Sequence, residues 1–279
     1  MAYSKPDKIM EITIENGTKK TTYSPLQTVI LGFEAGAFIA LGYLLCIRVT
    51  ASLSINLEGL SSLIGATVFP IGLILTLLAG GELLTGNMMA VPLARMAKKV
   101  TTSMVIYNWI LVTISNFLGA VFVAYFFGHI VGLTETGPYL EKTVSIAEHK
   151  LEASFHQAFI SGIGCNWLVA SAVWLSYGAN DMTGKIAGIW FPTMAFVAIG
   201  FQHVVANMFV IPAAIFAGHF SWLQYFNNFV PVFLGNAVGG TVFIAMAYWH
   251  AYRKKNVPYQ EPKIVQSIIK TLFDRFLYS

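Results

Sequence analysis

Two similar hexapeptides lie 120 positions apart, at residues 87–92 (NMMAVP) and 207–212 (NMFVIP). Each closes a long apolar segment that opens with Phe-Pro and is interrupted midway, by GGELLTG at 80–86 and by GFQH at 200–203. At the same offset, three further residues recur: Asn108, Asn116 and Gly119 as Asn228, Asn236 and Gly239. An internal repeat whose halves both carry a broken apolar segment is typical of membrane transport proteins.

The apolar content of the chain favours the same class of protein. Of its 279 residues, 56% are hydrophobic and 11% are charged, whereas soluble domains carry about 25% charged residues. We therefore expect a polytopic membrane protein in the lipid bilayer. Cys46 and Cys165 lie inside apolar stretches and are interpreted as small core residues, so we expect no metal site and no cofactor. The net charge of +4 does not indicate a nucleic-acid partner, because the basic residues are dispersed beside the apolar segments.

Six apolar segments predict an all-α integral membrane fold with six transmembrane helices: 27–47, 62–92, 104–127, 155–177, 187–217 and 229–252. The second and fifth are too long for one straight span, because a helix of that length would run about 46 Å across a bilayer core of about 30 Å. Their polar, glycine-bearing midpoints indicate that both helices break. Irregular backbone at membrane depth is stable only where protein or a water-lined cavity satisfies its polar groups.

The distribution of basic residues predicts the orientation. With both termini cytoplasmic, 14 of the 17 Lys and Arg residues lie inside, and only Arg48, Lys142 and Lys150 lie outside. The expected location is the plasma or inner membrane, and residues 1–24, which are polar and contain no signal peptide, form a cytoplasmic segment. Each repeat, at about 25–128 and 150–252, holds an odd number of spans. The second repeat is therefore expected to be inverted, with the two broken segments facing each other near the midplane.

Five polar residues lie within the apolar segments: Glu34, Glu82, Thr85, Asn166 and His203. An ionisable side chain at membrane depth is costly and marks a pathway by default. His203 lies at a break and can exchange a proton near physiological pH, and Thr85 lies in the equivalent break. Asn166 either orients the imidazole or makes an interhelical hydrogen bond. Glu82 either caps freed backbone amides or feeds protons, and Glu34 is expected to pack at a helix or subunit interface.

Bulky apolar residues surround these polar groups: Phe69, Leu73, Leu83, Phe196 and Phe201. Most of them are expected to pack in the core, and a few suffice to narrow a pore. Hydrophobic constrictions strip the hydration shell from whatever passes. This pattern argues against free ion conduction.

Four stretches resemble the formate–nitrite transporter family: 80–87 (GGELLTGN), 108–119 (Asn-Trp through Asn-Phe-Leu-Gly), 200–209 (GFQHVVANMF) and 232–240 (VFLGNAVGG). The likeness extends over about residues 25–252. It implies an aquaporin-like six-helix protomer with its own pore, assembled as a homopentamer.

The resemblance also implies roles for single residues. The central histidine of the family matches His203 and its partner threonine matches Thr85, with Asn166 as the central asparagine and Lys150 as the vestibule lysine. The pore-constricting positions match Phe69, Leu73, Leu83 and Phe196. Several members of the family have a glutamate just before the histidine, where this chain has Gln202. Without that carboxylate, Glu82 is the remaining candidate for a proton relay.

The function expected from these observations is a channel or proton-coupled carrier for small monovalent weak-acid anions, with formate first and nitrite or hydrosulfide next. An enzyme is not expected, because no nucleophile–base pair or metal cluster is visible. One alternative is a water or glycerol channel, although such channels usually show two Asn-Pro-Ala signatures and this chain has none. A second is a membrane-embedded sensor or enzyme that uses His203. Residues 253–279 carry an apolar helical stripe and predict an amphipathic helix on the inner leaflet.

Overall fold

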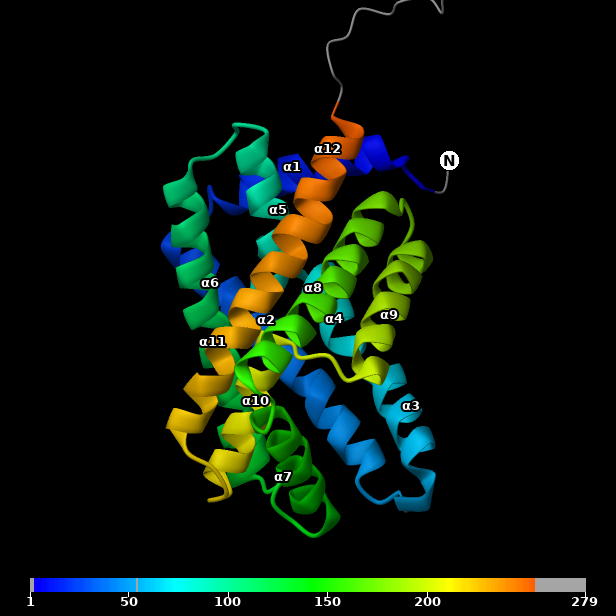
Figure 1. Ribbon diagram of the computed structural model, residues 1–279, viewed down its shortest axis with the longest axis vertical. Helices are drawn as coiled ribbons and strands as arrows, with labels where there is room; N and C mark the ends of the chain where they lie inside the picture. The colour runs from blue at the N-terminus through cyan, green and yellow to red at the C-terminus, as the bar shows by residue number, and fades with distance from the viewer. Residues whose placement is uncertain (1–2, 54, 254–279) are drawn as a thin grey trace, which may run out of the picture.

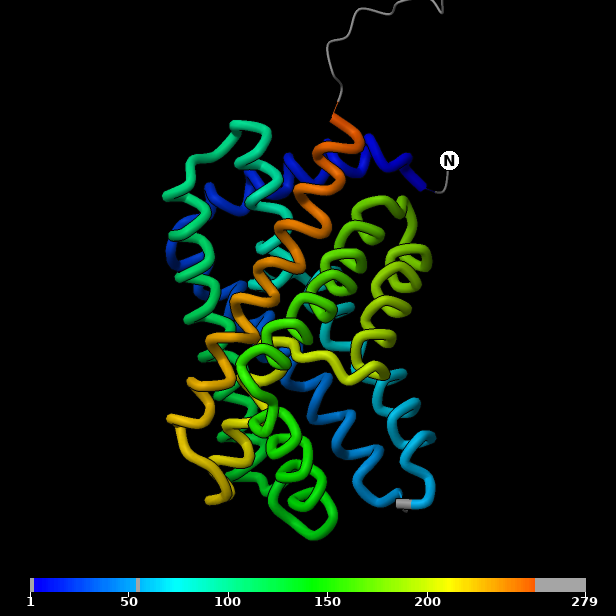
Figure 2. Tube along the Cα trace, in the orientation of Figure 1, coloured from blue at the N-terminus to red at the C-terminus, as the bar shows by residue number. Residues whose placement is uncertain are grey.

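The computed structural model describes residues 3–53 and 55–253, and this part of the chain is almost entirely helical (Figures 1 and 2). This part of the chain contains six helical stretches that are long and apolar enough to cross a membrane: Pro25–Thr50, Glu58–Gly80, Thr102–Ile130, Phe155–Gly178, Met182–Ile199 and Trp222–Tyr252. The predicted all-α fold with six transmembrane helices is confirmed.

The first half of the chain begins with a short amphipathic helix and continues through three spans. Its helices are α1 (Pro6–Lys20), α2 (Pro25–Thr50), the 3₁₀ turn η1 (Ile55–Leu57), α3 (Glu58–Val68), α4 (Ile71–Leu75), the π-helical turn η2 (Thr76–Gly80), α5 (Leu84–Met96), α6 (Thr102–Phe122) and the π-helical end η3 (Val123–Ile130).

The second half repeats this order, with a short helix before the spans. Its helices are α7 (Pro138–Leu151), α8 (Phe155–Gly178), α9 (Met182–Ile199), α10 (Val204–Phe216), α11 (Trp222–Val238), the π-helical stretch η4 (Gly239–Met246) and α12 (Ala247–Tyr252). The last span begins at Trp222 and not at 229 as expected, because Ser221 and Gln224 form a capping box that opens the helix earlier.

Both long apolar segments are broken, as their length predicts. The first stops at Gly80, which has a φ of +109°, and resumes as α5 after three residues outside any helix. The second stops at Gly200 in the left-handed conformation, with a φ of +86°, and resumes as α10. A positive φ favours glycine because glycine has no Cβ. From the two breaks, α5 and α10 lead toward opposite ends of the molecule (Figure 1).

The half-helices α5 and α10 form the centre of the molecule. Residues 84–94 of α5 and 204–214 of α10 are all buried, which is the expected pattern for a helix that is apolar on every side. Helix α1 packs against α5 at one end, and α7 packs against α10 at the other. The spans around them expose apolar side chains outward, for example Ile106, Ile110 and Ile114 on α6.

Glycines allow the outer spans to approach closely at equivalent places in the two halves. A Cβ on Gly119 of α6 would overlap the carbonyl of Phe33 on α2, and a Cβ on Gly239 would overlap the carbonyl of Ile163 on α8. Small residues are enriched at such contacts because they let helix backbones touch. The repeated contacts and the opposite directions of α5 and α10 agree with inverted repeats, which stay a prediction. The tail helix expected in 253–279 lies, apart from Arg253, outside the described residues.

Candidate functional site

The two breaks meet at a pair of buried side chains. Thr85, in the first turn of α5, and His203, which caps the start of α10, lie with Oγ1 and Nε2 2.9 Å apart. The other ring nitrogen of His203, Nδ1, accepts the backbone N–H of Ala206 at 3.1 Å. The sequence therefore placed these two residues correctly at equivalent breaks, and the fold brings them into contact.

The contact to Ala206 determines where the neutral imidazole carries its proton. A nitrogen that accepts an amide N–H holds no proton itself, so the proton of His203 lies on Nε2. His203 then donates to the hydroxyl oxygen of Thr85, and the hydroxyl proton of Thr85 is free to be donated to a third group. The resting pair thus presents a hydrogen-bond donor, which is suited to an anionic oxygen.

Asn166 on α8 holds the backbone beside this pair. Its amide nitrogen donates to the carbonyl of Thr85 at 3.2 Å and to the carbonyl of Asn236 at 2.7 Å. The interhelical hydrogen bond, one of the two expectations for Asn166, is therefore observed, and the side chain positions Thr85 rather than the imidazole. Its Oδ1 is buried and has no hydrogen-bond partner in the described part of the chain.

Asn116 on α6 supports the first break. Its Oδ1 accepts the N–H of Leu84, which begins α5, at 2.9 Å. Its amide nitrogen donates to the carbonyls of Gly32 and Glu82, each at 2.8 Å. One side chain thus satisfies two backbone groups of the break, the N–H of Leu84 and the carbonyl of Glu82, and links them to Gly32 on α2.

Asn236 on α11 does the same at the second break. Its Oδ1 accepts the N–H of Val204 at 2.9 Å, and its amide nitrogen donates to the carbonyls of Gly162 and Gln202 at 2.8 and 3.0 Å. The recurrence of this asparagine in the sequence therefore marks the same supporting role in both halves.

The first break also carries an ion pair. Lys20, at the end of α1, contacts Glu82 with Nζ and Oε1 2.7 Å apart, and both side chains are largely buried. The second oxygen of Glu82 accepts the amide of Asn87, which also donates to Asn108. Burial by itself lowers the pKa of Lys20, but the Glu82 carboxylate raises it and the net shift is upward.

The second break has the same frame without the ion pair. Asn207 donates to Gln202 at 2.8 Å and to Asn228 at 2.9 Å. The amide nitrogen of Gln202 donates to the backbone carbonyl of Lys150 at 3.2 Å. Within the described residues, no hydrogen-bond acceptor or carboxylate pairs with Nζ of Lys150, which lies 6.0 Å from the ring centroid of Tyr43. Burial lowers the pKa of Lys150 to about 8.

A cavity of about 410 Å³ leads from the end that carries α7 to His203. Five residues singled out from the sequence line it: Lys150, Phe69, Phe196, Phe201 and His203. The rings of Phe69 and Phe196 meet edge to face with centroids 5.7 Å apart, and Phe196 is also 5.7 Å from the imidazole. The aromatic pair therefore lies in the wall of the cavity beside the histidine, and its predicted role as a constriction stays a prediction.

Leu73 and Leu83 were expected to constrict the pathway as well. Both are almost fully buried, at 1% and 2% exposure, in the same apolar cluster as Phe69 and Phe196. Neither lines the cavity that reaches His203. Leu83 directly precedes α5 and lies two residues from Thr85.

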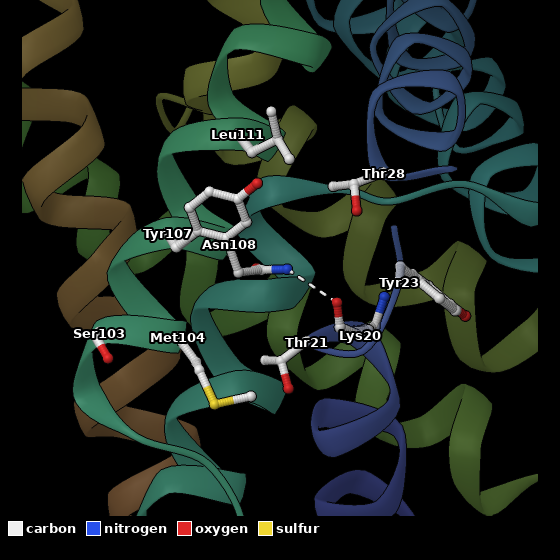
Figure 3. Close-up of a pocket in the computed structure, with 9 residues that line it drawn as sticks. All are labelled: Lys20, Thr21, Tyr23, Thr28, Ser103, Met104, Tyr107, Asn108 and Leu111. Atoms are coloured by element: carbon white, nitrogen blue, oxygen red, sulfur yellow. Dashed lines mark hydrogen bonds between the residues drawn. The ribbon is translucent and has the colours of Figure 1, made fainter. Parts of the chain in front are cut away.

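A smaller cavity, of about 230 Å³, opens at the end that carries α1. It lies between the α1–α2 connection and α6, and its lining includes Lys20, Tyr23, Thr28 and Tyr107 (Figure 3). Asn108 projects into this region and donates to the backbone carbonyl of Lys20 at 3.3 Å. The connection is thereby fixed to α6 at the point where the ammonium of Lys20 turns toward Glu82.

Sequence reasoning missed Lys20, although the chain carried a signal. Lys20 and Lys150 each precede by four residues a helix-capping serine, Ser24 or Ser154, that accepts the N–H of a glutamine three residues on. This spacing repeats at an offset of 130 and marks the two lysines as counterparts.

Comparison with known proteins agrees with this arrangement. The family model described as "Formate/nitrite transporter" matches residues 7–250. The uncharacterised transporter YrhG of Bacillus subtilis is 60% identical over 95% of this chain and 100% of its own length. The formate channel BtFdhC of Bacillus thuringiensis is 55% identical over 92% and 98%. The formate channel FocA of Escherichia coli is 31% identical over 90% and 95%.

Solved structures show the same fold. A chain described as an FNT family ion channel superposes with a TM-score of 0.82 at 28% identity, covering 88% of this chain and 98% of that one. A pentameric formate channel with formate bound superposes with a TM-score of 0.71 at 30% identity, covering 82% and 98%.

Proposed function

The chain belongs to the formate/nitrite transporter family, and we propose that it conducts small monovalent weak-acid anions, with formate as its main substrate. The buried contact between His203 and Thr85 carries this proposal, because it presents a donor at the meeting point of two broken helices. Relatives at 55% and 31% identity are formate channels by name, which supports formate over nitrite and hydrosulfide.

Charge energetics favour passage as the neutral acid. A bare anion pays heavily to enter a slit lined by Phe69 and Phe196, since neither ring replaces its lost water. Formic acid has a pKa close to that of a model carboxyl, so protonating formate at pH 7 costs about 4.5 kcal/mol, at about 1.36 kcal/mol per pH unit. That cost is smaller than dehydrating the anion outright.

Each residue of the pathway then has a role. Lys150 attracts the anion into the cavity, and the aromatic pair removes its water. At the breaks the hydroxyl of Thr85 donates to the anion, which is protonated beside His203. The acid leaves past Leu73 and Leu83, which form the second constriction.

Proton donation by His203 requires a local rearrangement. The ring must first gain a proton on Nδ1, and this nitrogen accepts the N–H of Ala206 in the resting state. Protonation therefore releases the first turn of α10 from the ring. Glu82 is not suited to relay this proton, because Lys20 and Asn87 occupy its two oxygens; we assign it to holding the first break.

The end that carries α7 faces outward in this proposal, and both termini are cytoplasmic. The distribution of Lys and Arg supports this orientation, because it leaves Arg48, Lys142 and Lys150 as the only basic residues outside. The protein then lies in the plasma membrane with the Lys150 cavity open to the exterior.

Assembly as a homopentamer is supported by a carboxylate on the outer face of α2. Glu34 is exposed on the protomer, two positions from Gly32, whose carbonyl accepts a hydrogen bond from Asn116 beside the first break. A carboxylate at this depth is unstable against acyl chains. A neighbouring protomer covers it in our proposal, and a solved neighbour is a pentameric formate channel.

Uptake by proteoliposomes tests the function. Formate, nitrite, hydrosulfide, acetate and lactate would be compared across a pH series while the internal pH is recorded. We expect saturable formate uptake that carries protons with it. Electrogenic formate flux without protons would overturn the neutral-acid mechanism in favour of a plain anion channel. Absence of flux for every anion would favour a membrane-embedded sensor or enzyme.

A further inference from the structure

We propose that the two ends of the pathway differ in charge, because Glu82 neutralises Lys20 whereas Gln202 leaves Lys150 uncompensated, and that this difference makes the anion bind more tightly from the end that carries α7. The inference rests on the proposed function, since it concerns how a weak-acid anion is captured. It specifies the end of the pathway from which the anion binds more tightly, which neither the contact between Thr85 and His203 nor the cavity defines.

The hydrogen-bonded frames around the two lysines are alike. The backbone carbonyl of each lysine accepts the amide of an asparagine, Asn108 for Lys20 and Asn228 for Lys150. Each of these asparagines accepts a hydrogen bond from a second asparagine, in the half-helix that follows the break, at 2.9 Å in both halves. The lysines therefore occupy equivalent positions in their frames.

The residue at the break distinguishes the two frames. One carboxylate oxygen of Glu82 accepts a hydrogen bond from Asn87, and the other accepts one from the ammonium of Lys20. The single side-chain oxygen of Gln202 accepts hydrogen bonds from Asn207 and Asn228. Its amide nitrogen donates to the backbone carbonyl of Lys150. An amide nitrogen cannot accept the ammonium of Lys150, so that charge stays available to an anion.

The free ammonium also lies where an anion enters. Lys150 lines the cavity that reaches His203, whereas the ammonium of Lys20 turns to Glu82 beneath the α1–α2 connection. A buried lysine without a carboxylate attracts an anion more strongly than one already paired at 2.7 Å. We expect a KM for formate about tenfold lower from the α7 end than from the α1 end.

A passive pathway limits what this difference can do. With equal pH on both sides and no membrane potential, the ratio of maximal rate to KM must be the same in both directions, because otherwise the protein would accumulate substrate without a driving force. The lower KM at the α7 end is therefore accompanied by a lower saturating rate from that end. Final formate levels stay unchanged.

The test exchanges the two residues. Initial rates of radiolabelled formate uptake would be measured in right-side-out and inside-out membrane vesicles at pH 7, with the potential clamped at zero. Q202E gives Lys150 a carboxylate and should raise the KM from the α7 end about tenfold. E82Q copies the arrangement already present at the other break and should lower the KM from the α1 end. The double variant E82Q/Q202E should reverse the ratio of the two KM values.

The possible results distinguish a failure of the proposed charge difference from a failure of the proposed transport function. Equal KM values from the two sides of the wild type, or a ratio that Q202E leaves unchanged, would overturn the inference and leave the proposed function intact. Absence of saturable formate flux from either side would overturn both. If E82Q fails to fold because Lys20 loses its partner, Q202E alone still decides the matter, since residue 202 contacts the backbone of Lys150 and lines a cavity together with it.

Discussion

The hydroxyl oxygen of Thr85 lies 2.9 Å from Nε2 of His203, although the two residues are 118 positions apart. Thr85 lies in the first turn of one half-helix and His203 caps the start of the other, and both half-helices are buried along most of their length. The imidazole is held on its far side by the N–H of Ala206. A neutral histidine that donates to a threonine thus occupies the centre of the protein, and the threonine hydroxyl is the donor left for a passing anion.

Replacing Thr85 by Val should reduce formate uptake at least tenfold while the protein still folds. Valine keeps the shape of threonine but leaves the Nε2–H of His203 without an acceptor, which costs about 1–3 kcal/mol in a buried site. Thr85→Ser restores the hydroxyl and should recover most of the rate. Uptake assays on purified protein compare the two variants. Equal rates for the valine and serine variants would show that the hydroxyl has no part in transport.

His203→Phe and His203→Asn should differ from each other. Phenylalanine removes every polar contact of the ring and should abolish weak-acid flux. Asparagine keeps polarity but cannot titrate, so we expect flux in which fewer protons accompany each formate, or leakage of strong-acid anions. Internal pH recorded together with uptake distinguishes these results. Wild-type proton coupling in the asparagine variant would place the protonation step elsewhere.

Formate capture from the α7 end should depend on the charge of Lys150. Burial lowers the pKa of this lysine from 10.5 to about 8. A lysine is charged below its pKa, so the attraction is present at pH 7 and is lost as the pH rises through about 8. The KM from that end should therefore rise between pH 7 and 9. The titratable or charged groups around the two cavities that Lys150 lines, and around the lysine itself, are Tyr43, Cys46, Glu58, Lys142, His149, Glu152, Cys165 and His203.

Variants of Lys150 check this assignment. Lys150→Arg stays charged and should remove the rise in KM above pH 8. Lys150→Ala should weaken capture, and Lys150→Glu should weaken it further. A glutamate variant with the rate and salt sensitivity of the wild type would exclude an electrostatic role for this position.

The lengths of the apolar segments predicted the fold, and the residues that recur in the two halves predicted the buried site at its centre. The two long apolar segments had to break because they exceed the bilayer core, and both do. The asparagines that recur at an offset of 120, such as Asn116 and Asn236, turned out to be the residues that satisfy the broken backbone. These features follow from local chemistry that each half repeats.

Features that depend on tertiary packing escaped sequence analysis. The partner of Glu82 is Lys20, 62 positions away, and the pairing exists only because α1 packs against α5. Glu82 was expected to cap amides or to relay protons, and neither alternative included an ion pair. The positions of Leu73 and Leu83 outside the cavity likewise depend on how the helices pack, which apolar periodicity does not determine.

Glu34 should be required for assembly. Glu34→Lys places a cation at the proposed subunit contact and should convert the pentamer into smaller species on native mass spectrometry. Glu34→Gln keeps both the size and the hydrogen-bonding capacity of the side chain and should remain pentameric. An intact pentamer in the lysine variant would mean that this face of α2 lies outside the contact.

Replacing Asn236 should reduce the stability of the protein more than replacing an exposed asparagine does. It accepts the N–H of Val204, which begins α10, and donates to the carbonyl of Gln202, so Asn236→Leu leaves two backbone groups of a buried break without partners and also removes the link to Gly162 on α8. Each such group costs about 1–3 kcal/mol, and we expect a loss of about 2 kcal/mol or more. Thermal unfolding in detergent would be compared with that of Asn227→Leu, an exposed asparagine on the same helix. Formate uptake should fall as well, because α10 begins next to His203. Equal stability of the two variants would show that water, and not Asn236, satisfies the broken backbone.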